Sequence, residues 1–124
     1  MDHMFYKCDK LRALDLSGFN TEKVENMGDM FSNCKNLETL NLSSFKTNNL
    51  TNMSEMFLEC HKIAQLDLSG FNTSGVKALD QVLKNCYALE ALDLSSFDTK
   101  WVTDMSSLFE YCQNLKTIYV SDRF

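Results

Sequence analysis

The chain has 124 residues, with 12 Lys and Arg against 17 Asp and Glu, so its formal net charge is -5. Nucleic-acid-binding proteins need a basic face, and this balance argues against that class. Hydrophobic residues make up 44% and charged residues 23%, values typical of a globular domain rather than a disordered chain. No apolar run approaches the roughly 18 residues of a membrane span, so we expect no transmembrane segment.

The cysteines recur at a fixed interval of 26 residues. They are Cys8, Cys34, Cys60, Cys86 and Cys112. Other apolar positions share this period, which is typical of a tandem array. We therefore predict a single domain over residues 1–124, made of about five 26-residue repeats. Neither end carries a polar capping unit, which such arrays need for solubility, so we expect the chain to be a section of a longer array.

Each repeat changes its apolar periodicity once. Met27, Met30, Phe31 and Cys34 have the i, i+3, i+4, i+7 spacing of one helix face. In the next repeat, Asn52 and Glu55 have the spacing of a capping box at a helix start.

A strand is predicted after each helix. Leu40 and Leu42 are two residues apart, so they point to the same side of a short strand. Ser43 and Ser44 then turn the chain, and Phe45 returns to the core. Stacking the repeats would bury these apolar positions as continuous ridges. The pattern predicts a right-handed α/β solenoid of the leucine-rich-repeat type, with a parallel sheet of short strands on one face and helices on the other.

The strand segment from Leu11 to Thr21 reads L-x-x-L-x-L-x-x-F-x-T, which resembles the leucine-rich-repeat core L-x-x-L-x-L-x-x-N-x-L. Phe stands where that core has Asn, and Thr where it has Leu. A closer resemblance is to the BspA-like surface-protein repeat, and it extends over every repeat. The matching residues of one copy are Met30, Phe31, Cys34, Leu37, Leu40, Leu42, Ser43, Phe45, Thr47, Leu50, Met53, Met56 and Phe57. This resemblance implies a bacterial surface protein with a role in adhesion.

The cysteines have four interpretations: a disulfide ladder, a soft-metal site, a nucleophile or small buried core residues. Parallel side chains in a stack would hold Cβ atoms near 5 Å apart, farther than the roughly 3.8 Å that a disulfide prefers. There is no C-x-x-C pair and no column of His residues, and His61 beside Cys60 would point away from it on a helix. We therefore expect buried structural thiols, with no catalytic residue, metal or cofactor.

The outward side of the predicted strands carries a row of polar residues. Its members are Asp15, Asn41, Asp67, Asp93 and Tyr119, with Gln65 beside them. Two interpretations stay open: a surface for a ligand or a basic partner, and a sheet face kept wet by charge. Trp101 lies off the apolar columns, and is either an exposed contact or a cover for the last repeat.

The repeat pattern, which lacks any catalytic or cofactor motif, predicts a non-enzymatic scaffold for protein–protein binding. The resemblance to the BspA-like repeat implies a role in adhesion, with a host or cell-surface protein as the partner and the bacterial cell surface or the extracellular space as the location, as part of a longer protein. The alternative is an intracellular, cytoplasmic interaction scaffold, which reduced cysteines and the lack of a visible signal peptide favour. End-to-end self-association of two copies is the alternative to a longer array as an explanation of the uncapped ends.

Overall fold

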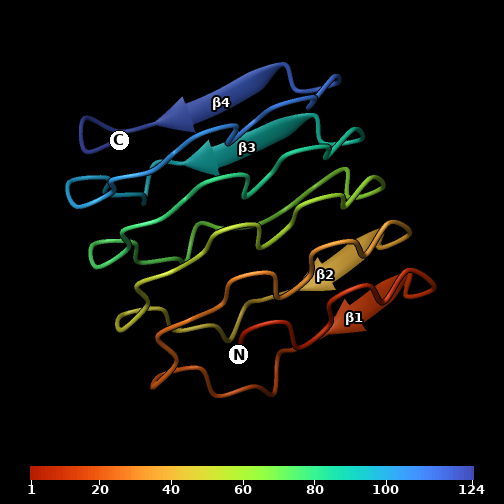
Figure 1. The fold of residues 1–124 in the computed structure, drawn as a ribbon, viewed down its shortest axis with the longest axis horizontal. Coiled ribbons are helices and arrows are strands. Elements are labelled where there is room, and N and C mark those ends of the chain that lie inside the picture. Colours follow the sequence, from red (N-terminus) through yellow and green to blue (C-terminus); the bar gives the residue numbers. More distant parts are fainter.

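The computed structural model describes residues 1–124, and the chain traces a stack of coils in which each 26-residue repeat, called a rung below, lies beside the next (Figure 1). Four short strands are present: β1 (Ala13–Asp15), β2 (Thr39–Asn41), β3 (Ala91–Leu94) and β4 (Thr117–Val120). β1 pairs in parallel with β2, and β3 with β4. The register joins residues one rung apart, such as Leu14 with Leu40 and Leu92 with Ile118.

The predicted α/β solenoid with helices on one face is wrong, because the structure contains no helix and its strands form two small parallel sheets. The third rung supplies no strand, and its residues 64–68 separate the two sheets. On the other side of each rung, where helices were expected, the chain runs through consecutive turns.

The backbone conformation explains why no helix forms. Two positions in every rung have positive φ, for example Asp29 at 53° and Asn33 at 62°. A left-handed residue interrupts the right-handed helical path wherever it occurs. Between these positions, alternate N–H groups donate to the next rung, as Phe31 N does to Met56 O at 2.9 Å. These groups are therefore not used for hydrogen bonds along a helix.

The predicted capping box is also replaced by another local structure. The Asn52 side chain accepts a hydrogen bond from the backbone N–H of Ser54 at 2.8 Å, which closes a turn only two residues long. Glu55 has a φ of 57°, a left-handed conformation that the third position of a helix does not adopt. The residue spacing of a capping box is thus present without a helix to cap.

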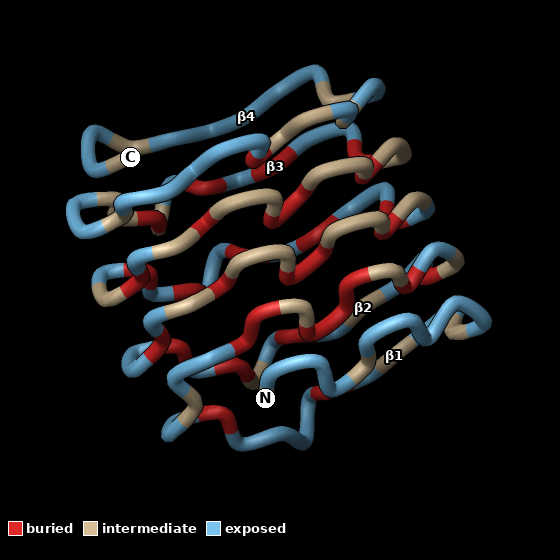
Figure 2. Tube along the Cα trace, viewed as in Figure 1, coloured by how far each residue is buried: buried red, intermediate tan, exposed pale blue.

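The predicted core residues are buried even though the helix is absent. Met27, Met30, Phe31 and Cys34 each have 0% of their surface exposed, because two successive turns place them on the same inner side. Buried positions recur through the central rungs, whereas the first and last rungs are largely exposed (Figure 2). The rings of Phe5, Phe31 and Phe57 stack along the molecule, with centroids 5.6 and 5.4 Å apart.

Candidate partner-binding face

The predicted polar row lies along the strand side of the rungs. Parallel register places Asp15 beside Asn41 and Asp93 beside Tyr119. Asp67 belongs to the third rung, between these pairs, and lies outside any strand. All five side chains belong to exposed residues, so the row is open to solvent.

The acidic members of the row are also structural. A carboxylate oxygen of Asp15, Asp67 or Asp93 accepts a hydrogen bond from the backbone N–H of the serine two residues later, at 2.9 to 3.0 Å. Asn41 does the same through its amide oxygen at 3.0 Å. These bonds close an Asx turn where the chain leaves the strand side.

Hydrogen bonding keeps these carboxylates ionised. The side-chain and backbone hydrogen bonds from Ser69 lower the pKa of Asp67, although the nearby charge of Asp93 acts in the opposite direction. Bonds from Ser95 lower the pKa of Asp93 in the same way. Each carboxylate therefore carries its charge at neutral pH, with one oxygen committed to the turn.

Two shallow hollows lie between β2 and the third rung. The larger, about 590 Å³, is bordered by Gln65 and Asp67 on one side and by Glu38 and Thr39 on the other. The smaller, about 210 Å³, runs from Asn41 past Asp67. No Lys or Arg lines either hollow. The structure therefore places Asn41, Gln65 and Asp67 along these two hollows, with Thr39 of the same outward face beside Gln65, and adds one residue that the sequence interpretation missed, Glu38.

Trp101 does not belong to this face. Its side chain lies in the turn beyond Thr99, outside β3 and β4, and the Lys100 ammonium is 5.1 Å from the centre of its ring. Trp101 and Tyr119 are both strongly exposed, at 60% and 61%, but neither lines the hollows. The predicted set therefore divides into a row on the strand side and a separate aromatic residue.

All five cysteines are free thiols. Four of them donate to a carbonyl oxygen of the preceding rung, as Cys34 Sγ does to Phe5 O at 3.1 Å and Cys60 Sγ to Phe31 O at 3.2 Å. Burial raises the pKa of Cys34 to about 11, and it also raises the pKa of Cys60 well above its ordinary range. Cys8 lies in the first rung and is exposed.

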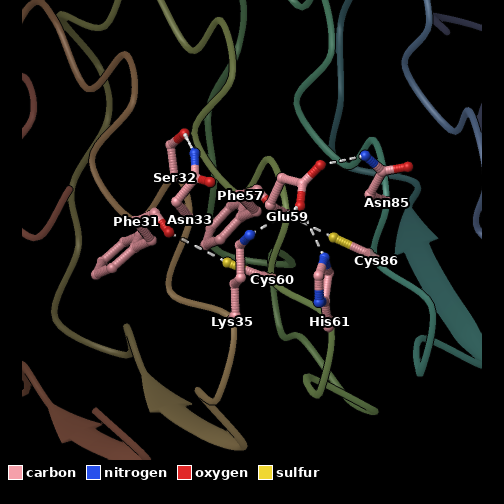
Figure 3. Close-up of polar contacts among 10 residues, drawn as sticks. All are labelled: Phe31, Ser32, Asn33, Lys35, Phe57, Glu59, Cys60, His61, Asn85 and Cys86. Atoms are coloured by element: carbon pink, nitrogen blue, oxygen red, sulfur yellow. Dashed lines mark hydrogen bonds and ion pairs between the residues drawn. The ribbon is translucent and has the colours of Figure 1, made fainter. Parts of the chain in front are cut away.

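A polar cluster around Glu59 crosses three rungs (Figure 3). Its carboxylate accepts from the Asn85 amide and lies 2.9 Å from His61 Nε2 and 3.7 Å from Lys35 Nζ. Burial raises the pKa of Glu59, but the hydrogen bonds from Asn85 and His61 outweigh it and leave the pKa lowered. The His61 ring also packs on Tyr87, with ring centroids 4.6 Å apart. This cluster ties neighbouring rungs together.

The two histidines differ in their surroundings. His3 is exposed, and its Nδ1 lies 2.8 Å from the Asp2 carboxylate. His61 is half-buried in the Glu59 cluster. The 26-residue period aligns Glu59 with Asn85 and His61 with Lys35, so the sequence carries a signal for this cluster that the sequence interpretation did not use. No group of three or more His, Cys, Asp or Glu side chains is arranged to hold a metal ion.

The structure and its polar row define a class of protein built from stacked 26-residue rungs with one exposed polar side. The chain belongs to the family described as "Mycoplasma protein of unknown function, DUF285", whose model matches residues 1–121. No curated protein and no solved structure matches it. The structure has no helix long and apolar enough to cross a membrane.

Proposed function

We propose that this chain is a non-enzymatic repeat scaffold that binds another protein, as an adhesion module at the bacterial cell surface. The observation that carries the proposal is the exposed polar row with its two hollows, where Gln65 and Asp67 meet Glu38 and Thr39. Hydrogen bonds from Ser69 lower the pKa of the Asp67 carboxyl there, and no cationic side chain lines the hollows. Such a surface suits a partner that presents Lys or Arg.

The resemblance of each rung to BspA-like leucine-rich-repeat surface proteins supports the adhesion role. It rests on residues such as Met30, Phe31 and Cys34 in their shared spacing. These residues are buried, so the resemblance concerns the scaffold and does not select the binding residues. The polar row supplies the candidates instead.

An intracellular interaction scaffold is the second candidate. The observation that favours it is the set of free thiols, which reducing compartments preserve. Labelling intact producing cells with a membrane-impermeant amine reagent separates the two candidates. Labelled protein supports the surface location, and labelling only after lysis supports the intracellular one.

The binding proposal is tested with beads coated with the chain and applied to cultured animal cells. Asp67→Lys together with Asp93→Lys reverses two charges of the row. We expect bead attachment to fall at least about tenfold, because like charges would then face a basic partner. Attachment at the wild-type level by this double variant would remove the row from consideration.

A matched control makes the same change in net charge at another place on the surface. Glu22 and Glu25 are exposed residues outside the strands and outside both hollows. Glu22→Lys with Glu25→Lys should leave attachment within about twofold of wild type, since long-range charge effects are screened over about 8 Å at physiological salt. An equal loss in both double variants would mean that net charge, rather than the row, controls attachment.

A further inference from the structure

The third rung interrupts the sheet in the middle of the stack. Between the first two rungs, Leu16 N donates to Asn41 O at 3.1 Å. One rung further on, the equivalent groups are the Leu42 N–H and the Asp67 carbonyl, and they form no hydrogen bond with each other. No backbone hydrogen bond joins β2 to the third rung, and both hollows lie across this gap. Polar backbone groups that a continuous sheet would pair are therefore free beside the hollows.

The residue at position 70 also distinguishes the third rung from its two neighbours. Gly70 stands where the rungs before and after it have Ser44 and Ser96. The Ser44 hydroxyl lies within hydrogen-bond distance of two carbonyl oxygens of the rung before it, Leu16 O at 2.9 Å and Phe19 O at 3.0 Å. The Ser96 hydroxyl bonds one carbonyl of the rung before it, at 3.4 Å. Serine at this position thus links its rung to the preceding one.

Gly70 leaves the corresponding carbonyls of the second rung without a hydroxyl. Leu42 O accepts only from Phe45 N, at 2.9 Å, and Phe45 O accepts no hydrogen bond. The turn from Leu16 to Phe19 is closed by the same 2.9 Å bond, so the two carbonyls of each turn have the same relation to the next rung. Phe45 is only 5% exposed, and buried carbonyls seldom lack a partner.

The backbone does not require glycine at position 70. Gly70 has no positive φ, and a Cβ atom added to it would have no other heavy atom within 4 Å. A serine would therefore fit there without strain. What Gly70 leaves instead is open space, and it lines the smaller hollow together with Leu42 and Phe45.

The chemistry of the smaller hollow suits a cation that donates hydrogen bonds. Leu42 O and Phe45 O are acceptors, Asp67 adds a carboxylate, and no Lys or Arg lines the hollow. One oxygen of this carboxylate already accepts from the Ser69 N–H at 3.0 Å and from its hydroxyl at 2.7 Å. A planar guanidinium that needs both carboxylate oxygens is therefore poorly matched. A compact lysine ammonium, with three separate donors, matches two carbonyls and one carboxylate oxygen.

We propose that the smaller hollow beside Gly70 is a subsite for a lysine side chain of the protein partner, an inference that rests on the proposed function. The ammonium donates to Leu42 O and Phe45 O, where a serine hydroxyl donates in the neighbouring rung, and to the Asp67 carboxylate. Gly70 determines the specificity of the subsite, because its missing side chain leaves room for the ammonium.

The experiment is a titration of the isotope-labelled chain with a short peptide, followed by the amide resonances in NMR spectra. The peptide has one lysine between flanking glycines, and both of its ends are blocked. We expect the resonances of Phe45, Asp67 and Gly70 to shift until they saturate. The same peptide with acetyl-lysine should cause no shift, and the arginine peptide should bind at least about fivefold more weakly. No shift with the lysine peptide, or equal binding of either substitute, would overturn the proposal.

Gly70→Ser tests the subsite directly, because it supplies the hydroxyl that the neighbouring rungs have. The affinity for the lysine peptide should fall at least about tenfold, since the hydroxyl takes the two carbonyls. The urea midpoint of unfolding should rise for the same reason. Gly18→Ser makes the same change on the first rung, outside both hollows, and should bind the peptide like wild type. Wild-type affinity in Gly70→Ser would overturn the proposal.

Gly70→Ala is a second variant that fills the space without adding a donor. It should weaken binding of the lysine peptide without raising the urea midpoint, so it keeps the test open if Gly70→Ser folds poorly. Wild-type affinity in this variant would contradict a subsite that depends on open space at Gly70.

Bead attachment separates this proposal from the proposed function. Loss of attachment in both Gly70→Ser and the Asp67→Lys, Asp93→Lys variant supports the subsite. Loss in the double variant alone would keep the polar row as the binding face and overturn the lysine subsite. Wild-type attachment by both would overturn both proposals.

Discussion

Thr21, Thr47 and Thr73 repeat one hydrogen-bonded arrangement at the same bend of successive rungs. The Thr47 hydroxyl accepts from Asn72 N at 2.7 Å and donates to Asn72 O at 3.1 Å. Thr21 and Thr73 bond the following rung in the same way. These hydroxyls therefore serve the backbone of the neighbouring rung. Each hydroxyl satisfies the backbone N–H and C=O of one residue in the following rung. Those two groups form no hydrogen bond with any other backbone group.

Replacing Thr47 with Val should lower the free energy of unfolding by about 1–3 kcal/mol, because it removes the part-buried hydrogen bonds of the Asn72 N–H and C=O. Urea unfolding monitored by circular dichroism measures the change. Thr47→Ser keeps the hydroxyl and should retain most of the stability. Equal losses in both variants would assign the effect to the methyl group instead.

The thiols also serve backbone groups, and their burial controls their reactivity. Cys34, Cys60 and Cys86 are buried, whereas Cys8 is exposed and Cys112 is half-buried. A thiolate is the reactive form, and burial raises the pKa of Cys34, Cys60 and Cys86.

In a thiol titration of the folded chain at slightly alkaline pH, we expect Cys8 to react first and Cys112 more slowly. Cys34, Cys60 and Cys86 should react only when a denaturant is added. Mass spectrometry of the labelled peptides identifies each site. Rapid labelling of Cys60 in the folded protein would contradict the buried arrangement.

At the scale of the element, turns take the place of the predicted helices. The left-handed residues repeat at two columns, one containing His3, Asp29, Glu55, Gln81 and Ser107 and the other containing Lys7, Asn33, Glu59, Asn85 and Tyr111. Neither column contains Gly, the residue for which this conformation carries no steric cost. Hydrogen bonds to the next rung offset that cost, as Gln81 N–H does by donating to Ser106 O at 2.9 Å.

Substitutions of Gln81, whose φ is 54°, test whether these turns require a left-handed residue. Gln81→Val should lower the free energy of unfolding by about 1–2 kcal/mol, since a β-branched side chain is strained in the left-handed region. Gln81→Gly should be neutral or slightly stabilising relative to wild type. Chemical unfolding of the three proteins gives the comparison, and a stable Val variant would argue for a helix at this position.

At the scale of the whole molecule, one hydrophobic core runs through the stack. Only the central rungs have a rung on each side that covers their core residues. Phe45, Phe71 and Phe97 are nearly buried, whereas Phe19 of the same column is 37% exposed. The rings of Phe45 and Phe71 stack with centroids 6.3 Å apart. Stability in such a stack depends on the contacts between adjacent rungs.

Phe71→Ala should lower the free energy of unfolding by about 3–5 kcal/mol, because it removes a large side chain between two filled rungs. Phe19→Ala, at the open end of the same column, should lower it by only about 1–2 kcal/mol, in line with its partial exposure. Thermal and urea unfolding measure both. A small loss for Phe71→Ala would refute a continuous core.

The 26-residue period by itself determined which residues form the core, because burial follows from where apolar side chains repeat, whatever the local backbone does. It placed Met27, Met30, Phe31 and Cys34 on one inner side, and the structure buries all four completely. It also placed Asp15 and Asn41, and Asp93 and Tyr119, at adjacent positions of neighbouring strands.

Only the tertiary structure decided the backbone conformation of the segment from Met27 to Cys34. The spacing i, i+3, i+4, i+7 is satisfied equally by a helix and by two successive turns, so the pattern alone could not separate them. The turns prevail because N–H groups such as that of Phe31 find acceptors on the next rung, a partner that no local pattern contains. The 26-residue period aligns Thr39 with Gln65 and Glu59 with Asn85, but only the tertiary structure decided that a hollow forms at the first pair and a hydrogen bond at the second.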